Sequence, residues 1–190
     1  MNKKEALQAF HCLRKTPFGP VGVIWSVYRG RPKIWRVLIS KSGVSAKHLV
    51  RTSFPDSVFS SCSEVDAVAN KILAFLNGDN IRFSLDINRL DLCSKFQQKV
   101  LRAEHGIPRG RVSTYRRIAK HLGNDNAARA VGGALANNPF PIIIPCHRAI
   151  RSNGELGGFQ GGLRMKKALL EHEGVSISDE GKVLKTSIYY

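Results

Sequence analysis

The sequence predicts two domains in a chain of 190 residues, a small α/β domain at 1–91 and a mainly α-helical domain at 92–190. The first half holds short apolar and alternating runs around one helical stripe, which indicates a small antiparallel sheet with a helix. The second half holds short helical patterns separated by glycines, and two of them form a helix-turn-helix of winged-helix type. We therefore expect two packed units rather than one sheet.

The charge of the chain indicates a polyanionic partner. Lys and Arg number 30 against 14 Asp and Glu, a net charge of +16. Residues 92–167 contain 14 Lys or Arg and three acidic residues, so this segment alone carries +11. Nucleic acid is the commonest partner of such a surface and an anionic membrane a rarer one. A surface adapted for solubility or heat is the alternative.

Cysteine usage and hydropathy predict an intracellular protein. The four cysteines, at 12, 62, 93 and 146, are far apart and form no Cys-x-x-Cys pair, which disfavours a zinc ribbon or a disulfide framework. The first residues are charged and polar, unlike a signal peptide. No apolar run approaches the roughly 20 residues of a membrane span. We expect no membrane partner and a cytoplasmic location, or a nuclear one in a eukaryote.

The first half predicts a hairpin, a helix and a further strand. Turn residues from Thr16 lead into a strand ending at Tyr28, and Arg29-Gly30 is a plausible hairpin turn before a strand at 33–39. A loop is expected at 53–63. Ser63 is the candidate N-cap of a helix at 63–76, and the alternation at 81–87 predicts a half-buried strand. His11 and Cys12 lack partners at metal-ligand spacing, so we expect them to pack.

The second half predicts four helices. Their expected ranges are 94–104, 113–122 with Ser113 as N-cap, 125–137 and 163–173, with Gly174 ending the last one and a short hairpin or loose tail at 176–190. The third helix is made almost wholly of small residues, and its two adjacent glycines cost about 1 kcal/mol each relative to Ala. Such a surface admits close approach of a partner. Either this helix enters a narrow groove, where Arg129 could push between stacked bases, or it packs tightly on a neighbouring helix.

The segment from Pro141 to Arg148 holds the candidate nucleophile. Three isoleucines between two prolines predict a buried extended segment. Cys146 follows at once, beside His147 and Arg148, and a thiol next to potential cations is the setting of a reactive thiolate. Beyond it, a glycine-rich loop at 151–162 could close over a pocket with Phe159 as a flat wall. The loop lacks the Lys-Ser/Thr ending of a P-loop, which disfavours nucleotide hydrolysis.

These motifs together resemble the O6-alkylguanine-DNA alkyltransferases, the methylated-DNA–protein-cysteine methyltransferases. The resemblance covers roughly 94–175 and rests on these segments in order: Phe96-Gln-Gln-Lys-Val100, Val112-Ser-Thr-Tyr115, Ala128-Arg-Ala-Val-Gly-Gly133, Asn138-Pro139, Ile144-Pro-Cys-His-Arg148, Gly157-Gly-Phe-Gln-Gly-Gly-Leu163 and Leu170-Glu-His-Glu-Gly174. The first half matches more weakly, mainly through Thr16-Pro-Phe-Gly-Pro-Val-Gly22.

The resemblance implies a single-turnover repair reaction. A guanine alkylated at O6 would be flipped out of duplex DNA, and Cys146 would take the alkyl group irreversibly, without cofactor or metal; O4-alkylthymine is a further candidate substrate. His147 would accept the thiol proton through a water, and Glu173 would orient that imidazole. Asn138 would hold the site together, and Tyr115 would donate to the leaving guanine. The implied substrate pocket comprises Pro141, Phe159, Gln160 and Gly161.

The resemblance also implies how DNA is bound. The protein would bind double-stranded DNA as a monomer. Its small-residue helix would enter the minor groove, with Arg129 filling the gap in the base stack. The implied contact residues are Tyr115, Ala128, Arg129, Gly132, Gly133 and Ala136. Where some relatives carry Tyr and Ser, this chain has Phe159 and Gln160, so backbone amides near Gln160 would replace a hydroxyl at the guanine O6.

Three other functions compete with repair. A regulator that binds DNA only through the helix-turn-helix would leave Cys146, His147 and Glu173 unexplained. A non-catalytic sensor of alkyl damage lacks the reactive cysteine that is present here. A cysteine hydrolase would need an oxyanion hole and a small-molecule pocket, which nothing in the sequence marks.

Overall fold

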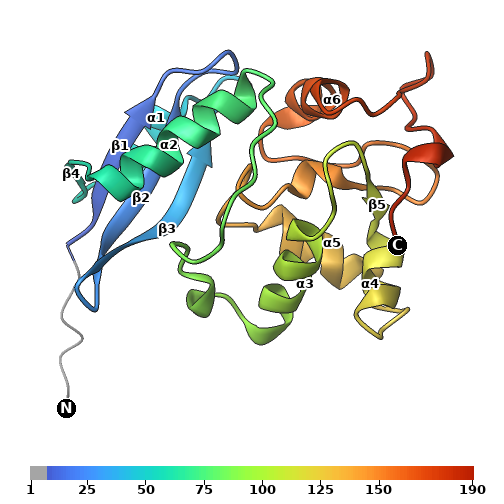
Figure 1. The fold of residues 1–190 in the computed structure, drawn as a ribbon, viewed down its shortest axis with the longest axis horizontal. Helices are drawn as coiled ribbons and strands as arrows, with labels where there is room; N and C mark the ends of the chain where they lie inside the picture. Colours follow the sequence, from blue (N-terminus) through green and yellow to red (C-terminus); the bar gives the residue numbers. More distant parts are fainter. Residues whose placement is uncertain (1–7) are drawn as a thin grey trace.

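The computed structural model describes residues 8–190 and places a small sheet beside a cluster of helices (Figure 1). The elements are β1 (Phe10–Arg14), β2 (Val21–Tyr28), β3 (Arg31–Ile39), α1 (Ala46–Ser53), β4 (Val58–Phe59), α2 (Ser63–Leu76), η1 (Leu90–Leu92), α3 (Lys95–His105), β5 (Ser113–Thr114), α4 (Tyr115–His121), α5 (Ala128–Ala136), η2 (Cys146–Arg148), β6 (Ala149–Ile150), α6 (Gly162–His172) and η3 (Lys185–Ser187). The expected mixture of a small sheet with helices is confirmed. Residues 1–7 of the expected first domain lie outside the described residues.

The sheet has the strand order β3-β2-β1-β4 and is built on the predicted hairpin. β2 and β3 pair antiparallel, and both turn residues have positive φ, 51° at Arg29 and 72° at Gly30. Two positive φ values give a tight turn whose twist matches that of the flanking strands. The sequence analysis did not predict β1, which pairs antiparallel with β2, or the two-residue β4, which pairs parallel with β1 within the expected loop.

The helix α2 has the predicted bounds and lies across the sheet (Figure 1). Its buried side chains, including Val65, Ile72 and Phe75, belong to the main core together with residues of β2 and β3. The expected N-cap was wrong by one position. Cys62 occupies the cap with extended backbone and makes no side-chain cap bond, while Ser63 is already helical. Helix α1, which is capped by Ser45, was not predicted.

The strand expected at 81–87 is not formed. This segment joins the sheet region to the helical region as extended chain and makes only isolated ladder contacts, with Ile34 donating to Ile87 O at 2.8 Å and Arg89 donating to Ile34 O at 2.9 Å. The apolar and polar residues do alternate in burial. The alternation therefore reports which side of the chain is covered, but no neighbouring strand lies along the segment.

The helical half contains the four predicted helices with shifted ends. Ser94 caps α3 by accepting from Gln97 N, a cap that the sequence analysis did not predict, and Gly174 follows α6 with φ 83°, as expected. The expected cap of α4 was wrong, because Ser113 lies in β5 and Thr114 accepts from Arg117 N instead. Helix α5 begins at Ala128, three residues later than the expected start.

The isoleucine segment before Cys146 is buried but is not simply extended. Ile142 has a φ of 75°, which is unusual for a β-branched residue, and Ile144 N donates to Phe140 O at 2.8 Å. These features make a tight turn between Pro141 and Pro145. Every residue from Phe140 to Ile150 is buried. The nucleophile thus sits on a packed turn.

The tail at 176–190 packs against the helical half. Ile177 and Val183 form an antiparallel bridge, and Val112 forms a parallel bridge with Ile188. The Tyr190 ring stacks on His121 at 4.0 Å between centroids. The tail is therefore a structural part of this half. Among residues 8–190, no helix is both long enough and apolar enough to cross a membrane.

Candidate active site

The short helix η2 presents three buried residues in succession, Cys146, His147 and Arg148. Cys146 is 6% exposed and His147 is fully buried. Pro145 precedes the helix, and Cys146 N donates to Ile144 O at 2.8 Å, which ties the nucleophile to the tight turn. The support is rigid because the turn and the helix share one packed core.

Glu173 links the two residues that follow the thiol. Its Oε1 lies 3.0 Å from His147 Nε2. Arg148 donates from Nε to Oε2 at 2.8 Å and from Nη2 to Oε1 at 2.7 Å. Arg148 Nη1 also donates to Ile107 O at 2.5 Å. Burial alone would raise the pKa of Glu173, but hydrogen bonds and charges from His147 and Arg148 outweigh it and lower the pKa to about 2. Glu173 is therefore an anion at neutral pH.

This anion fixes the tautomer of His147. A carboxylate can only accept, so His147 Nε2 carries the proton and donates to Glu173. His147 Nδ1 then has a lone pair, and it is buried with no hydrogen-bond partner in the described part of the chain. Burial lowers the pKa of His147, while Glu173 acts in the opposite direction. The neutral imidazole can accept a proton at Nδ1.

The Cys146 thiol is protonated at rest. Burial raises its pKa to about 11, which a hydrogen bond with Asn138 and the charge of Lys166 only partly oppose. A reaction that needs the thiolate must therefore remove this proton during the chemical step. The neutral His147 is the buried base beside it in sequence.

Asn138 braces the turn that carries the thiol. Its Nδ2 donates to Ile144 O at 3.0 Å, and its Oδ1 accepts from Phe140 N at 2.9 Å. Asn138 is 1% exposed, so these bonds are made away from water. The amide thus fixes both ends of the Ile142 turn.

Two buried charged residues near the thiol were missed by sequence reasoning. Lys166 of α6 is fully buried, and its Nζ donates to Ala149 O at 2.6 Å and to Gly158 O at 3.2 Å. Glu104 of α3 is also fully buried, and neither carboxyl oxygen has a hydrogen-bond partner among residues 8–190. Both residues act on the Cys146 charge, Lys166 favouring the thiolate and Glu104 opposing it. On helices otherwise rich in charge, no sequence signal marked them as buried.

The glycine-rich loop closes against the same residues. The Phe159 ring lies edge-on to the His147 ring at 6.1 Å, and Gln160 Nε2 donates to Asn138 O at 2.8 Å. A Cβ on Gly157 would lie 3.0 Å from the Tyr115 hydroxyl, and one on Gly161 would lie 2.2 Å from Met165 Sδ. The loop therefore needs glycine at both positions to approach Tyr115 and α6. Pro141 is buried in the turn beside them.

The fold and part of the sequence match proteins of known activity. The family model for the DNA-binding domain of 6-O-methylguanine DNA methyltransferase matches residues 95–175. A methylated-DNA–protein-cysteine methyltransferase of Methanothermobacter thermautotrophicus is 42% identical over 116 residues, 61% of this chain and 65% of the relative. The crystal structure of Mycobacterium tuberculosis O6-methylguanine methyltransferase superposes with a TM-score of 0.68 at 29% identity, over 87% of this chain and 93% of that one.

Residues 95–175 thus resemble the DNA-binding domain of the methylated-DNA–protein-cysteine methyltransferases. The crystal structure of Mycobacterium tuberculosis OGT in complex with DNA also matches, with a TM-score of 0.65 at 28% identity over 86% of this chain and 92% of that one. The aligned sequence spans less than two thirds of the curated relatives, 65% of the Methanothermobacter protein and 59% of a Mycobacterium leprae one.

The structure brings some of the residues expected from this methyltransferase family together and leaves others apart. Cys146, His147, Glu173 and Asn138 form one buried cluster, and the partly exposed glycine-rich loop contacts it through Gln160. The α5 residues lie outside it, on the surface. The exposed residues of α5 are Arg129, Ala130, Gly133 and Ala136. Two further small residues, Ala128 and Gly132, are half-buried.

The small residues of α5 have different neighbours. A Cβ on Gly132 would meet only Tyr115, at 4.0 Å, and a Cβ on Gly133 would meet nothing within 4 Å. Tight packing on a neighbouring helix therefore does not require these glycines. Val131 and Leu135 of α5 are buried, and the helix packs against α3 and α4, so its open surface is confined to the face that carries Gly133.

No group of three or more His, Cys, Asp or Glu side chains suited to a metal ion occurs within residues 8–190. His11 Nδ1 is instead 2.9 Å from Ser57 Oγ, and Cys12 is buried in the core. All four cysteines are free thiols.

Proposed function

We propose that this protein repairs DNA by transferring the alkyl group of O6-alkylguanine, with O4-alkylthymine as a further candidate, irreversibly to Cys146. The new bond joins Cys146 Sγ to the alkyl carbon, and the bond between that carbon and O6 breaks. The guanine leaves with the bonding electron pair and takes up a proton, so atoms and charge balance. No cofactor or metal takes part, and each molecule reacts once because the thioether is not reversed.

One observation carries this proposal: the protonated thiol of Cys146 is followed by a buried imidazole whose Nδ1 is free to accept a proton. As the sulfur attacks, His147 Nδ1 takes the thiol proton, directly or through a water. The negative charge of Glu173 stabilises the imidazolium through the 3.0 Å contact with Nε2. Arg148 holds the carboxylate in place with two bonds, which makes it a positioning residue.

The leaving base also needs stabilisation. Burial raises the pKa of Tyr115, so its hydroxyl stays protonated and can donate to the ring of the departing guanine. Phe159 and Pro141 would bound the pocket for the flipped base, and the backbone near Gln160 and Gly161 would face its O6. Asn138 keeps the turn and this loop together through its amide and its main-chain oxygen.

The open face of α5 supports entry into the minor groove of double-stranded DNA. Ala128, Gly132, Gly133 and Ala136 offer little bulk there, and exposed Arg129 could occupy the space of the flipped nucleotide. With α4, the turn after it and the β5–β6 pair, this unit is proposed as a winged-helix-like helix-turn-helix. The protein would act as a monomer in the cytoplasm, or in the nucleus of a eukaryote, with the domain boundary near residue 91.

A mass measurement tests the reaction. After incubation with duplex DNA containing O6-methylguanine, the tryptic peptide with Cys146 should gain the mass of one CH2 group. Cys146→Ala should bind the same duplex but show no gain on any cysteine. An unchanged peptide from the native protein would refute alkyl transfer and favour a sensor or regulator that only binds.

The helix contact has its own test. Gly133→Leu adds bulk where no neighbour lies within 4 Å, so the fold should persist while affinity for duplex DNA falls at least tenfold. Gly123→Ala, in the turn before α5, is not a suitable control, because Gly123 has a φ of 77° and alanine would strain the backbone there. Ser53→Leu, on the exposed surface of α1, is the control because it adds bulk elsewhere without changing the charge. Equal affinity for Gly133→Leu and the native protein would contradict minor-groove entry of α5.

A further inference from the structure

One arginine joins the two halves of the molecule beside the buried cluster, and the reaction as described does not use it. The chain that follows α2 runs between the sheet and α6 (Figure 1). Arg109, in the turn after α3, donates to this chain from Nη1 to Asp79 O at 3.0 Å and from Nη2 to Gly78 O at 2.9 Å. The same Nη2 donates to His172 O at 2.5 Å. Arg109 thus holds the end of α6 to the end of α2.

The three acceptors lie at or just beyond the C-terminal ends of two helices. Helix α6 ends at His172, and its main-chain oxygen is one of the last four carbonyls that a helix leaves without an internal partner. Gly78 and Asp79 follow the last turn of α2. A cation is favoured at such ends, because the helix dipole is negative there. Arg109 has no ion-pair partner among residues 8–190, so its guanidinium serves these main-chain oxygens.

The turn that carries Arg109 also touches both members of the Glu173–Arg148 pair. A Cβ on Gly110 would lie 3.1 Å from the main-chain oxygen of Glu173, so the two stretches of chain are in close contact. The main-chain oxygen of Ile107 accepts from Arg148 Nη1 at 2.5 Å. The turn, the carboxylate and the guanidinium of this pair therefore form one packed unit.

Arg109 gives this unit an anchor that it otherwise lacks. Glu173 is the cap residue of α6, and a helix end whose last carbonyls are unpaired frays readily. Helix α2 is a firm support, because its buried side chains belong to the main core. The contact of Glu173 with His147 Nε2 is 3.0 Å long, and a hydrogen bond weakens steeply when its geometry is lost. Movement of the α6 end would therefore weaken the contact that stabilises the imidazolium.

We propose that Arg109 is a positioning residue for alkyl transfer, which holds Glu173 at hydrogen-bond distance from His147 by tying the end of α6 to the end of α2. This inference rests on the proposed function and deepens it, because it assigns a role in the reaction to a residue outside the buried cluster. The matched segment begins at residue 95, so the anchor after α2 lies in a part of the chain that the family model does not match.

The test is the single-turnover rate of transfer to Cys146 at saturating concentrations of a duplex containing O6-methylguanine. Arg109→Ala should lower this maximal rate at least tenfold, because general acid–base catalysis contributes roughly 10²–10⁴-fold and requires a correctly placed base. Arg109→Lys keeps the charge and the stem but not the planar fork, so it should stay folded and lose less of the rate. Thermal melting shows whether each variant is folded at the assay temperature.

The pH dependence of this rate separates positioning from support of the fold. His147 must be neutral to accept the thiol proton, so the rate falls on the acid side as the imidazole becomes protonated. Among the charged groups that act on this imidazole, Glu173 favours its protonation, and Arg148 and Lys166 oppose it. A displaced Glu173 stabilises the imidazolium less, so the acid limb of both Arg109 variants should lie at lower pH than the native limb. A variant that is only less stable would keep the limb in place.

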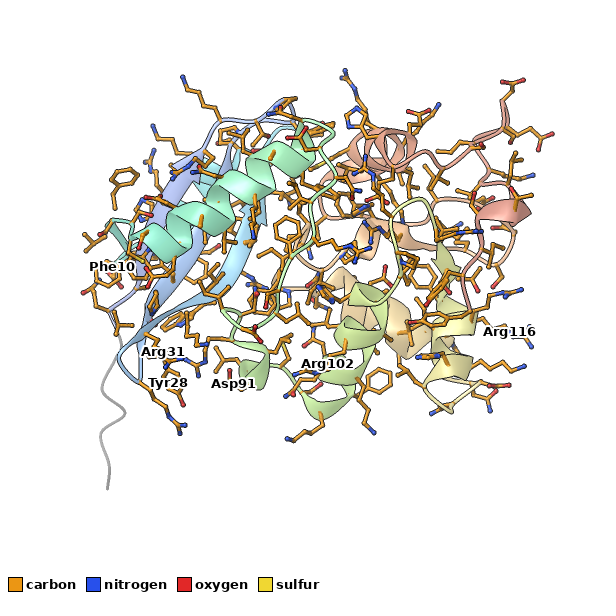
Figure 2. The ribbon with its side chains drawn as sticks, viewed as in Figure 1. Phe10, Tyr28, Arg31, Asp91, Arg102 and Arg116 are labelled. Atoms are coloured by element: carbon orange, nitrogen blue, oxygen red, sulfur yellow. The ribbon has the colours of Figure 1, made fainter. Side chains whose placement is uncertain are left out.

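Two controls remove a positive charge without touching the contact between α2 and α6. Arg102→Ala changes an exposed residue of α3, which Figure 2 shows away from α6. Arg111→Ala breaks one bond of the same kind, from Nη1 to Thr186 O at 2.8 Å. Both controls should keep the native maximal rate and acid limb. A native rate for Arg109→Ala would overturn the proposal, and so would a slower rate with an unchanged limb or an equal loss in either control.

Failure of this inference and failure of the proposed function are separable. A native protein without an adduct on the Cys146 peptide would refute the reaction itself. A native protein that forms the adduct at the same rate as Arg109→Ala would keep the repair function and lose the role of Arg109.

Discussion

Replacing Glu104 by Gln should stabilise the protein at neutral pH. Glu104 is fully buried on α3, and within the described part of the chain both carboxyl oxygens lack a hydrogen-bond partner. Burial raises its pKa from 4.5 to about 8, although the charges of Lys166 and Arg148 oppose the shift. The native protein must therefore hold a proton that the unfolded chain has already released.

The size of the effect follows from this difference in pKa. A carboxyl whose folded pKa is raised destabilises the fold progressively as pH rises from its unfolded pKa, here 4.5, to its folded pKa, here about 8. At about 1.4 kcal/mol per unit, the penalty at pH 7 is about 3 kcal/mol, and it nearly vanishes at pH 4. Glu104→Gln cannot ionise, so it should escape this penalty.

The assay is urea unfolding of both proteins at pH 5 and pH 7.5. The Gln amide also lacks partners, which adds an offset that does not vary with pH. The stability gap between variant and native protein should therefore grow by about 3 kcal/mol from pH 5 to pH 7.5. The range ends there because burial lowers the pKa of Lys166 to about 8, so Lys166 titrates above it.

A surface carboxyl provides the comparison. Glu171→Gln, on exposed α6 surface and 3.8 Å from Lys167, should shift stability by less than about 0.5 kcal/mol at either pH. A gap for Glu104→Gln that is the same at pH 5 and pH 7.5 would show that this carboxyl is ionised in the native protein and would refute the reasoning.

Three further predictions concern the site. Glu173→Gln should lower the free energy of unfolding in urea by about 3 kcal/mol at pH 7 and by little at pH 2. The reason is that the lowered pKa of Glu173 stabilises the fold above pH 4.5, and this gain is lost as pH falls through about 2. A loss of stability that does not depend on pH would contradict it. Gly161→Ala should destabilise by about 1–3 kcal/mol through the clash with Met165, measured by thermal melting, and Met165→Ala in the same chain should restore part of the loss. Asn138→Ala should slow alkylation of Cys146 more than tenfold while duplex affinity holds, as single-turnover and binding assays would report, and an unchanged rate would contradict its bracing of the turn.

The sequence predicted elements that carry their own periodic signal. Helix α2 has the bounds that the sequence predicted, because its apolar stripe faces one sheet. The strand expected at 81–87 did not form, because alternation shows one-sided burial whereas a strand also needs a neighbouring strand. The isolated bridge in this region joins Ile34 to Asn88, just after the segment. The tight turn at Ile142 was missed because a run of isoleucines gives no sign of positive φ.

The candidate site divides in the same way. Sequence motifs were enough to name Cys146, His147 and Glu173. The structure places the His147 Nε2 atom 3.0 Å from the Glu173 Oε1 atom. Glu104 and Lys166 could not be named, because their burial depends on how α3 and α6 pack rather than on their local sequence. The packing of the C-terminal tail could not be predicted either, because it depends on contacts between distant residues, such as Arg111 with Thr186 at a separation of 75.

The positive φ of Ile142 bears on how this protein could be made more robust. An unfavourable backbone conformation costs on the order of 1–3 kcal/mol, which the surrounding core must supply when the chain folds. Substitution by glycine would relieve the strain but would also free the backbone that aims the sulfur. Selection for heat resistance alone would then favour sequences that react more slowly, so stability and repair rate should compete at this single position.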